Sequence, residues 1–413
     1  MKHILFMLNN YRLSEDMSGI GLRMLEIAQV LSGHCNITIY SNIPSDIRLD
    51  NINLVSCADN KLEHYINICD AVVSTDIPDM EMLLYAYKLD KQIVIENSIP
   101  IEHLFYSEMT SSMNIDEKYN QLIMQFYFQL IVADIFIARS FPEEQTLIAC
   151  LALVGRLNTY TYTNEGQFSD LISKIPIGFN NFSETHRSEH CYNTTKDEYE
   201  CDLLWSGGIW DYLNPNMIID ALNILPITER PKIHFLYKPP SDQYINAYEE
   251  LKNRIEKDNI SNIAFIDNII HSKRDIHIEK AKALICVGKN TLENKTCHRL
   301  RLRDCFLYKK PIIVDRYGAT GLFVQANNIG LTVNNANDLT DAIKILMHDN
   351  NKYAELVSSI ESIREQYLIE NNIGHLLNAI SMGKRAEDIR TNKWKEKISS
   401  FISKHNKLFI SQR

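Results

Sequence analysis

Short apolar runs rich in β-branched residues recur along the first half of the chain, separated by longer mixed segments. Several of these runs are apolar almost throughout, which is typical of strands covered on both faces of a parallel sheet. They lie at 3–8, 36–40, 70–75, 92–96, 133–138 and 173–178. The alternation of strand and helix patterns predicts a doubly wound, Rossmann-like α/β domain.

The segment between the first two runs shows a helical period. Met24, Ile27, Ala28 and Leu31 follow the i, i+3, i+4, i+7 spacing, and Gly33 follows them closely. One apolar stripe that ends at a glycine predicts a helix with a single buried face. A strand, a helix and a strand in this order predict a parallel pair.

The alternation stops at 181–200, which is polar and has no apolar period, and then it resumes. The second set of apolar runs lies at 202–207, 232–237, 263–267, 283–288, 311–315 and 330–333. Because 413 residues are too many for one ordinary core, we expect two domains, 1–184 and 201–384, with a linker at 185–200. Ligands of such sheets bind at the carboxyl ends of strands, which predicts a site in a cleft between the domains.

Composition narrows the class of protein. The chain has 43 lysines and arginines against 52 aspartates and glutamates, a formal net charge of −9. Nucleic-acid binding depends on clustered positive charge, so this balance argues against a nucleic-acid partner. No run of about 18 apolar residues is present, which argues against a membrane span. The nine cysteines are scattered without a C-x-x-C pair, which predicts reduced thiols in a cytoplasmic protein.

Several glycines are paired at predicted junctions between a strand and the following helix or loop. The pairs are Gly19 with Gly21, Gly207 with Gly208, and Gly318 with Gly321. Glycine lets backbone amides approach a ligand, and the N-terminus of a helix favours an anion. A tight turn explains any single pair equally well. Three such junctions at one cleft predict a phosphate-bearing ligand.

The type of phosphate ligand is narrowed by motifs that the sequence lacks. The dinucleotide fingerprint fails because Met24 stands in place of its third glycine, and no G-x-x-x-x-G-K-[ST] loop is present. No D-x-D motif is present either, so we expect no carboxylate clamp for a metal ion. Helix ends and arginines must then neutralise a diphosphate, without a metal ion or a cofactor.

Three arginines, Arg299, Arg301 and Arg303, lie close together between Glu293 and Asp304. Guanidinium groups match phosphate geometry, so this cluster is a candidate diphosphate site. On a helix Arg299 and Arg303 would share one face and Arg301 would point away, so we do not expect all three to touch one ligand. A solvated basic patch paired with the two acids explains the spacing as well, and both interpretations stay open.

Three motifs carry a family resemblance. Residues 18–34 read SGIGLRMLEIAQVLSGH, residues 203–215 read LLWSGGIWDYLNP, and residues 299–311 read RLRLRDCFLYKKP. With looser matches at 96–106 and 133–156, these motifs resemble those of bacterial GT-B-fold glycosyltransferases, in particular the retaining, family-four-like branch. The resemblance covers nearly the whole chain.

This resemblance implies a fold and a reaction. In the GT-B fold two Rossmann-like domains face across a cleft, and a C-terminal helix, here within 385–413, crosses back to the first domain. The reaction transfers a sugar from a nucleoside-diphosphate sugar, with UDP or GDP, to a hydroxyl of a glycan, lipid-linked or protein acceptor. The resemblance implies a metal-independent, anomer-retaining enzyme of bacterial cell-surface polysaccharide or glycoconjugate biosynthesis. The second domain would hold the donor, and the first would hold the acceptor.

The resemblance also implies roles for individual residues. Those expected at the reacting centre are Arg301, Glu293, Arg299 and His103. Those expected to bind the donor are Gly207, Gly208, Ile209, Trp210, Lys238, Asp304, Gly318, Ala319 and Thr320. Those expected on the first domain's side of the cleft are Gly19, Ile20, Gly21, Arg23 and Glu102. Arg301 and Arg299 would stabilise the leaving diphosphate, Asp304 would accept the ribose hydroxyls, and Glu293 would lie near the sugar.

Departures from the family pattern keep other interpretations open. Glu293 precedes Asp304 by eleven residues, whereas retaining relatives commonly have two glutamates eight apart. Ala319 replaces an acid, Lys238 would substitute for cations that wider relatives carry earlier, and an ordinary surface histidine explains His103 equally well. A sugar-nucleotide epimerase of the same fold and a catalytically silent binding subunit therefore stay alternatives.

The segment 385–413 is basic, with eight lysines and arginines against three acids. Its residues Trp394, Ile398, Phe401 and Ile402 have helical spacing, which predicts a basic amphipathic helix. We expect this helix to pack on the first domain. The further hypothesis is that its basic face also contacts an anionic membrane, as a peripheral contact from the cytoplasmic side.

Overall fold

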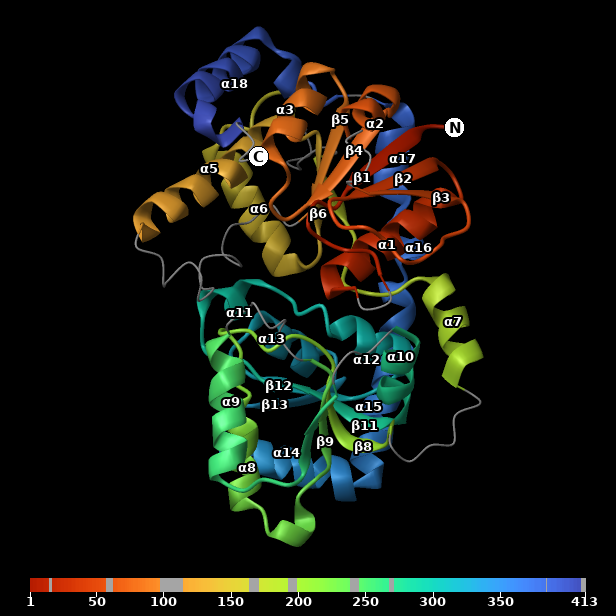
Figure 1. The fold of residues 1–413 in the computed structure, drawn as a ribbon, viewed down its shortest axis with the longest axis vertical. Coiled ribbons are helices and arrows are strands. Elements are labelled where there is room, and N and C mark those ends of the chain that lie inside the picture. The colour runs from red at the N-terminus through yellow and green to blue at the C-terminus, as the bar shows by residue number, and fades with distance from the viewer. Residues whose placement is uncertain are drawn as a thin grey trace. The chain divides into compact units, whose positions relative to one another are not determined.

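The structure is a computed structural model that describes residues 1–14, 17–56, 62–96, 114–162, 171–191, 199–237, 245–266, 271–383 and 385–409. The chain divides into two compact units. Among the described residues, the first unit comprises those within 1–96, 114–176 and 369–409, and the second comprises those within 177–368. Each unit contains one parallel sheet flanked by helices (Figure 1).

The first unit is built on a seven-stranded parallel sheet of order β3-β2-β1-β4-β5-β6-β7. Its strands are β1 (His3–Met7), β2 (Asn36–Ser41), β3 (Ile52–Ser56), β4 (Ala71–Thr75), β5 (Gln92–Glu96), β6 (Ile135–Ala138) and β7 (Ile172–Lys174). Every residue of β4, β5 and β6 is buried, as the apolar runs predict for strands covered on both faces.

Two strands of this sheet differ from the prediction. No apolar run predicts β3, because this edge strand mixes buried with exposed residues. The run at 173–178 forms a strand only over Ile172–Lys174. The chain then reaches Pro176, which has no N–H group to donate to a strand ladder.

The helices of the first unit are α1 (Gly19–Ser32), α2 (Leu62–Ile68), α3 (Met80–Lys88), α5 (Ile115–Val132), α6 (Phe141–Leu153), α16 (Ile369–Asn372), α17 (Gly374–Met382) and α18 (Asn392–Lys404), followed by the 3-10 turn η7 (Asn406–Phe409). Helix α1 confirms the predicted pattern: its four apolar positions from Met24 to Leu31 are fully buried, and Gly33 is its C-cap. Ser18 caps the other end by accepting the N–H of Gly21 at 3.2 Å. No helix in the described ranges has both the length and the apolar content needed to span a bilayer.

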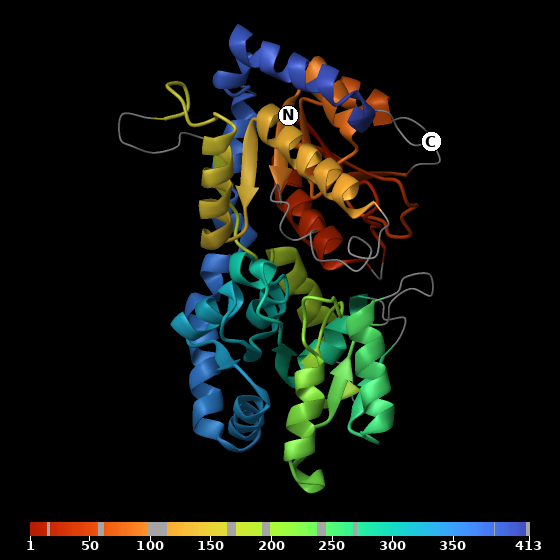
Figure 2. The ribbon, with the colours of Figure 1, turned by 90° about the vertical axis from the view of Figure 1, so that its left-hand side faces the viewer.

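The chain returns to the first unit at Ile369, so α16, α17 and α18 belong to it. In α18, Ile398 is fully buried, and the indole N–H of Trp394 donates to the carbonyl of Ile131 in α5 at 2.8 Å. Figure 2 shows this last helix, in blue, lying over α5. The predicted crossing of the C-terminal helix back to the first domain is confirmed.

The second unit is built on a six-stranded parallel sheet of order β10-β9-β8-β11-β12-β13. Its strands are β8 (Cys201–Trp205), β9 (Ile233–Phe235), β10 (Ile263–Phe265), β11 (Ala281–Cys286), β12 (Ile312–Asp315) and β13 (Gly330–Val333). Each overlaps a predicted apolar run. Its helices are α7 (Asn181–Cys191), α8 (Asn216–Ile224), α9 (Asn246–Lys257), α10 (His271–Lys280), α11 (Leu292–Thr296), α12 (Leu302–Tyr308), α13 (Ala319–Ala326), α14 (Ala336–His348) and α15 (Asn350–Ile363).

The polar stretch 181–200 differs from the linker that the sequence predicts, because its first part forms α7 and belongs to the second unit. Asn180 starts the helix by accepting the N–H of Ser183 at 2.8 Å. Arg187 then ties the helix to α10 through an ion pair with Glu279 at 2.7 Å. Polar contacts of this kind leave no apolar period in the sequence.

The two ends of the second unit meet each other. Phe179 and Leu368 form an isolated parallel bridge, and the N–H of Phe179 donates to the carbonyl of Tyr367 at 3.2 Å. The chain leaves the first unit after Pro176 and returns to it after Leu368. Ile175 and Ile369 lie next to these two boundaries in the first unit, and both belong to one hydrophobic core cluster.

Candidate functional site

The second sheet contains a reversal of strand order beside β8. From β8 the chain builds outward to β9 and β10, and it then returns to place β11 on the other side of β8. Ligands of open α/β sheets bind at the carboxyl ends of the strands at such a reversal. Here those ends are Trp205 of β8 and Cys286 of β11.

The turn after β8 contains the predicted glycine pair. The ring of Trp205 is fully buried, and its N–H donates to the carbonyl of Gly208 at 3.2 Å. A Cβ on Gly207 would lie 3.1 Å from Nε of Arg301, and one on Gly208 would lie 2.6 Å from the ring of Trp210. The pair therefore lets a guanidinium group and an aromatic ring pack directly on the backbone of the turn. The next residue of the motif, Ile209, is fully buried in the core.

Arg301 bridges the two strands at the reversal. Its Nη2 donates to the carbonyl of Gly208, and its Nη1 lies 2.5 Å from the sulfur of Cys286. Its guanidinium carbon lies 4.7 Å from the centroid of the Trp205 ring, which is a cation–π contact. The residue is half-buried, and none of its contacts in the described part of the chain is with a carboxylate. The positive charge of Arg301 is therefore available to an anionic ligand at this point.

Arg299, in contrast, is paired with a carboxylate. Its guanidinium forms a buried ion pair with Asp315 at the end of β12, and it donates to Oδ1 of Asn294 at 2.9 Å and to the carbonyl of Cys286 at 2.5 Å. Burial acts to lower the pKa of Arg299, but Cys286 and Asp315 beside it outweigh burial and raise its pKa overall. Contact between Arg299 and a diphosphate stays a prediction.

The arrangement of the three arginines corrects one expectation. Helix α12 begins at Leu302, so Arg299 and Arg301 precede it and the helical spacing applied to them is wrong. Arg299 and Arg301 both contact Cys286, through its carbonyl and its sulfur, whereas Arg303 donates to Asp304 at 3.2 Å. The structure thus brings together Arg299 and Arg301, the pair that helical spacing separates.

Asp304 lies at the centre of a buried polar network beside the glycine turn. Its Oδ2 accepts from the hydroxyl of Ser206 at 2.8 Å and from Nη2 of Arg274 at 2.6 Å, and its Oδ1 accepts from Arg303. Asp304 is only 1% exposed, so the network fixes the turn against α10 and α12. Its predicted contact with ribose hydroxyls stays a prediction.

Sequence reasoning missed Arg274 and Asp315. Arg274 lies in a polar helical segment, and no spacing or motif marks it. Asp315 did carry a signal, because it is an acid at the end of an apolar run; it is fully buried and accepts the N–H of Gly288 at 2.7 Å. These two residues hold predicted site residues in place, because Arg274 contacts Asp304 and Asp315 contacts Arg299.

The glycine pair after β12 lies at the N-terminus of α13. Gly318 is the N-cap residue, and no side chain caps the helix. Ala319 and Thr320, which form the first turn, are buried. The N–H groups at the start of a helix lack partners within the helix and favour an anion. Gly321 is needed because a Cβ there would overlap the carbonyl of Asp315.

Glu293 lies in α11, the short helix after β11. Its side chain is buried, at 5% exposure. The neighbouring Asn294 donates to the carbonyl of Tyr212 at 2.9 Å and so fixes α11 to the segment after the glycine turn. A position of Glu293 beside the transferred sugar stays a prediction.

The residues predicted for the first domain's side of the cleft lie at the start of α1. Gly19 and Ile20 begin this helix, and a Cβ on Gly21 would lie 3.3 Å from the carbonyl of Arg12. Arg23 is 5% exposed: it forms an ion pair with Glu96 at 2.5 Å and donates to the carbonyls of Ile175 at 2.6 Å and Pro176 at 2.9 Å. These contacts join the ends of β5 and β7 to α1. The predicted residues Glu102, His103 and Lys238 lie outside the described residues.

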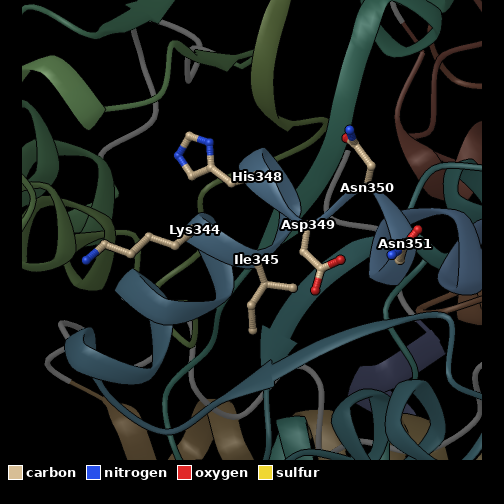
Figure 3. Close-up of a pocket in the computed structure, with 6 residues that line it drawn as sticks. All are labelled: Lys344, Ile345, His348, Asp349, Asn350 and Asn351. Carbon is tan, nitrogen blue, oxygen red and sulfur yellow. The ribbon is translucent and has the colours of Figure 1, made fainter.

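A surface hollow of about 620 Å³ lies elsewhere in the second unit, where α14 meets α15. Its lining residues are Lys344, Ile345, His348, Asp349, Asn350 and Asn351. Figure 3 shows that these side chains fan out instead of converging on one point. The adjacent carbonyl of Met347 accepts from Lys282 at the start of β11, so the hollow lies at the amino edge of the sheet. We therefore assign the candidate site to the carboxyl edge.

No known protein-family model matches the chain, and no curated protein sequence matches it. Solved structures do match in fold. Sucrose-phosphate synthase from Thermosynechococcus elongatus matches with a TM-score of 0.66 at 14% identity, covering 93% of this chain and 100% of that one. Anabaena HepE in complex with UDP-glucose matches with a TM-score of 0.59 at 14% identity, covering 92% and 100%.

WaaG, a glycosyltransferase involved in lipopolysaccharide biosynthesis, matches with a TM-score of 0.61 at 10% identity, covering 92% of this chain and 99% of that one. Identities this low show the fold. Because the matches span nearly the whole chain and both sheets, the protein has the GT-B fold that the sequence motifs imply.

Proposed function

We propose that this protein is a glycosyltransferase that moves a sugar from a nucleoside-diphosphate sugar to an acceptor hydroxyl. Arg301 carries the proposal: among the described residues it has no carboxylate partner, and it spans the strand reversal beside Gly208. The N-terminus of α13, which no side chain caps, follows β12 at the same sheet edge. The fold is also similar to that of HepE, whose structures hold UDP-glucose or UDP, which makes a UDP-sugar the first donor to test and a GDP-sugar the second.

In the proposed mechanism the bond between the anomeric carbon of the sugar and the diphosphate breaks while the acceptor oxygen bonds to that carbon. The diphosphate gains negative charge as its bond breaks, and it then takes up the proton of the acceptor hydroxyl. Arg301 and the first N–H groups of α13 would stabilise that charge, and Arg299 would support Arg301 through their shared contact with Cys286. One fixed donor of this kind contributes about 3–4 kcal/mol to a transition state. We propose that these groups make a metal ion unnecessary and that the anomeric configuration is retained, as the family resemblance implies.

The acceptor is proposed to be a glycan, lipid-linked or protein hydroxyl bound by the first unit. Synthesis of a bacterial surface polysaccharide or glycoconjugate is the proposed setting, supported by the similarity in fold to WaaG. The protein would then work in the cytoplasm, with the basic segment 385–413 in peripheral contact with the membrane.

A donor panel tests this proposal. The purified chain is incubated with UDP- and GDP-sugars, with and without a mixture of glycan and lipid-linked acceptors, and release of the nucleoside diphosphate is measured. Release that depends on an acceptor supports the transferase. An epimerised sugar nucleotide formed without acceptor would instead identify an epimerase, and nucleotide binding without turnover of any donor would identify a binding subunit.

A further inference from the structure

A groove lies between α5 and α18 in the first unit. Four residues of α18 at helical spacing and its C-cap residue form one wall, and two residues of α5 form the other. The lining residues are Met124, Tyr127, Lys397, Ser400, Phe401, Lys404 and His405. We call this the α5–α18 groove. Its volume of about 340 Å³ falls in the range of small-molecule sites.

The lining of the α5–α18 groove combines positive or donor groups with an apolar floor. Its polar side chains are two lysines, a serine, a histidine and the hydroxyl of Tyr127, and none of its seven residues is acidic. Phe401 stacks on Tyr127 with ring centroids 5.2 Å apart and an interplanar angle of 21°, which gives the floor a fixed shape. An anion attached to an apolar body complements this lining.

The surroundings of the groove are also positively charged. Residues 390–409 hold six lysines and arginines against one glutamate, in a chain whose net charge is −9. The amine of Lys397 lies 4.4 Å from the centroid of the Trp394 ring. Burial, together with the positive charges of Lys393 and Arg156, lowers the pKa of Lys397. The nearby charges that act on this amine are therefore of its own sign.

An exposed apolar segment lies next to the same helix. Lys397 donates to the carbonyl of Val154, which joins α18 to the end of α6. In this segment Leu153 is 88% exposed, Leu157 is 42% exposed and Tyr160 is 54% exposed. Exposed leucine and tyrosine beside lysines are typical of surfaces that enter the interfacial region of a membrane. The exposed apolar segment at 153–160 therefore favours a lipid over a small soluble anion as the occupant of the groove.

We propose that the α5–α18 groove binds the phosphate headgroup of an anionic lipid, with Lys397, Ser400 and Lys404 facing the phosphate and the apolar floor contacting the glycerol and the first acyl carbons. The inference deepens the proposed membrane contact of 385–413 by giving it one binding site. It does not depend on donor chemistry in the second unit.

Filling the groove without changing charge tests the proposal. Ser400 lines the groove, whereas the adjacent Ser399 is exposed and does not line it. Co-sedimentation is measured with vesicles of phosphatidylcholine alone and of phosphatidylcholine with phosphatidylglycerol. We expect Ser400→Trp to weaken binding to the anionic vesicles about tenfold and Ser399→Trp to leave it unchanged, which at the groove is a loss of about 1.4 kcal/mol. Equal binding by the two variants, or no preference of the wild type for the anionic vesicles, overturns the proposal.

A second pair of variants separates a site from general charge attraction. Lys404 lines the groove, and Lys395 is an exposed lysine of the same helix that does not. The two substitutions change the net charge equally, but only Lys404 lines the groove. If the groove is the binding site, Lys404→Glu should therefore weaken vesicle binding several-fold more than Lys395→Glu. Equal losses would show that charge alone drives binding and would refute the groove. If the chain binds soluble glycerol 3-phosphate but does not bind vesicles, the ligand of the groove is a free phosphate compound and the lipid proposal is refuted.

The donor site supplies an independent control. Melting shifts caused by UDP or GDP should be the same in Ser400→Trp as in the wild type, because the two sites lie in different units. An intact nucleotide shift shows that the second unit of the variant is folded, and an unchanged circular dichroism spectrum and melting midpoint without nucleotide show the same for the first unit, which carries the substitution. Failure of the nucleotide shift in the wild type would count against the proposed glycosyl transfer and leave the groove unaffected.

Discussion

Arg23 in the first unit and Arg301 in the second both lie beside a glycine pair that follows a strand, but their surroundings differ. Arg23 is 5% exposed, and its guanidinium is satisfied by the carboxylate of Glu96 and by two backbone carbonyls. Arg301 is half-buried, and its contacts among the described residues are a carbonyl, a sulfur and an indole ring. An arginine in a family motif can therefore either stabilise the fold or present an uncompensated charge that a ligand can bind. Whether a carboxylate already pairs with the arginine distinguishes these two roles.

The largest effect expected from this comparison is on stability. Arg23→Ala leaves the carboxylate of Glu96 buried without its cation, which should lower the free energy of unfolding by about 3–5 kcal/mol. Denaturant unfolding measures the loss, and hydrogen exchange assigns it to the first unit. The control is Arg12→Ala, which breaks the exposed pair of Arg12 with Asp46 and should cost at most about 1 kcal/mol. Equal losses in the two variants would contradict the structural role of Arg23.

The next effect is on catalysis. Arg301→Ala should reduce kcat/KM by a factor that corresponds to about 2–4 kcal/mol, because it removes the fixed cation that we propose stabilises the leaving diphosphate. Arg301→Lys should restore little, since a lysine cannot contact the carbonyl and the sulfur with one planar fork. The control is Arg316→Ala, which removes an exposed arginine directly after β12. If Arg301→Ala keeps near wild-type turnover, the assignment of Arg301 is wrong.

Donor binding should give a smaller, measurable shift in stability. At a hundredfold excess over its Kd, a nucleoside diphosphate that binds only the folded state adds about 2.7 kcal/mol to the free energy of unfolding. For a unit of this size that raises the melting midpoint by several degrees, at roughly 2–4 °C per kcal/mol. The shift should persist in the presence of a chelator and shrink in Arg301→Ala. A shift that vanishes with the chelator would contradict the metal-independent site.

The smallest effect expected is a response of the second unit to acid. His234 is 2% exposed, and burial, followed by the charges of Lys232 and His277, lowers its pKa to about 4. The unfolded chain, with a histidine pKa near 6.5, therefore binds a proton that the folded chain does not, and stability falls as pH drops from about 6.5 to about 4. We expect a loss of about 1–3 kcal/mol across this window, measured by denaturant unfolding at each pH. His234→Leu should flatten the response, and an unchanged slope would show that other groups cause it.

The fold follows from the sequence more fully than the site does. Apolar runs locate most strands because both faces of a parallel strand are buried, and this burial leaves its mark on consecutive residues. Polar partners leave no such local mark. Glu96 is 73 residues from Arg23, and Asp315 is 16 residues from Arg299, so which arginine would be paired could not be inferred from spacing. Motif letters identify candidate residues, and only the folded chain shows which of their charges are already compensated.

The bridge between Phe179 and Leu368 has a consequence for how such a protein can be assembled from parts. The described residues of the second unit all lie within 177–368, close to whose two ends Phe179 and Leu368 are paired, and the first unit resumes at Ile369 in the same core cluster as Ile175. In genetic terms the second unit is an insertion whose boundaries lie side by side. A recombination event that exchanged residues 177–368 for the equivalent stretch of another chain would therefore replace the nucleotide specificity of the proposed donor site while leaving the core of the first unit intact.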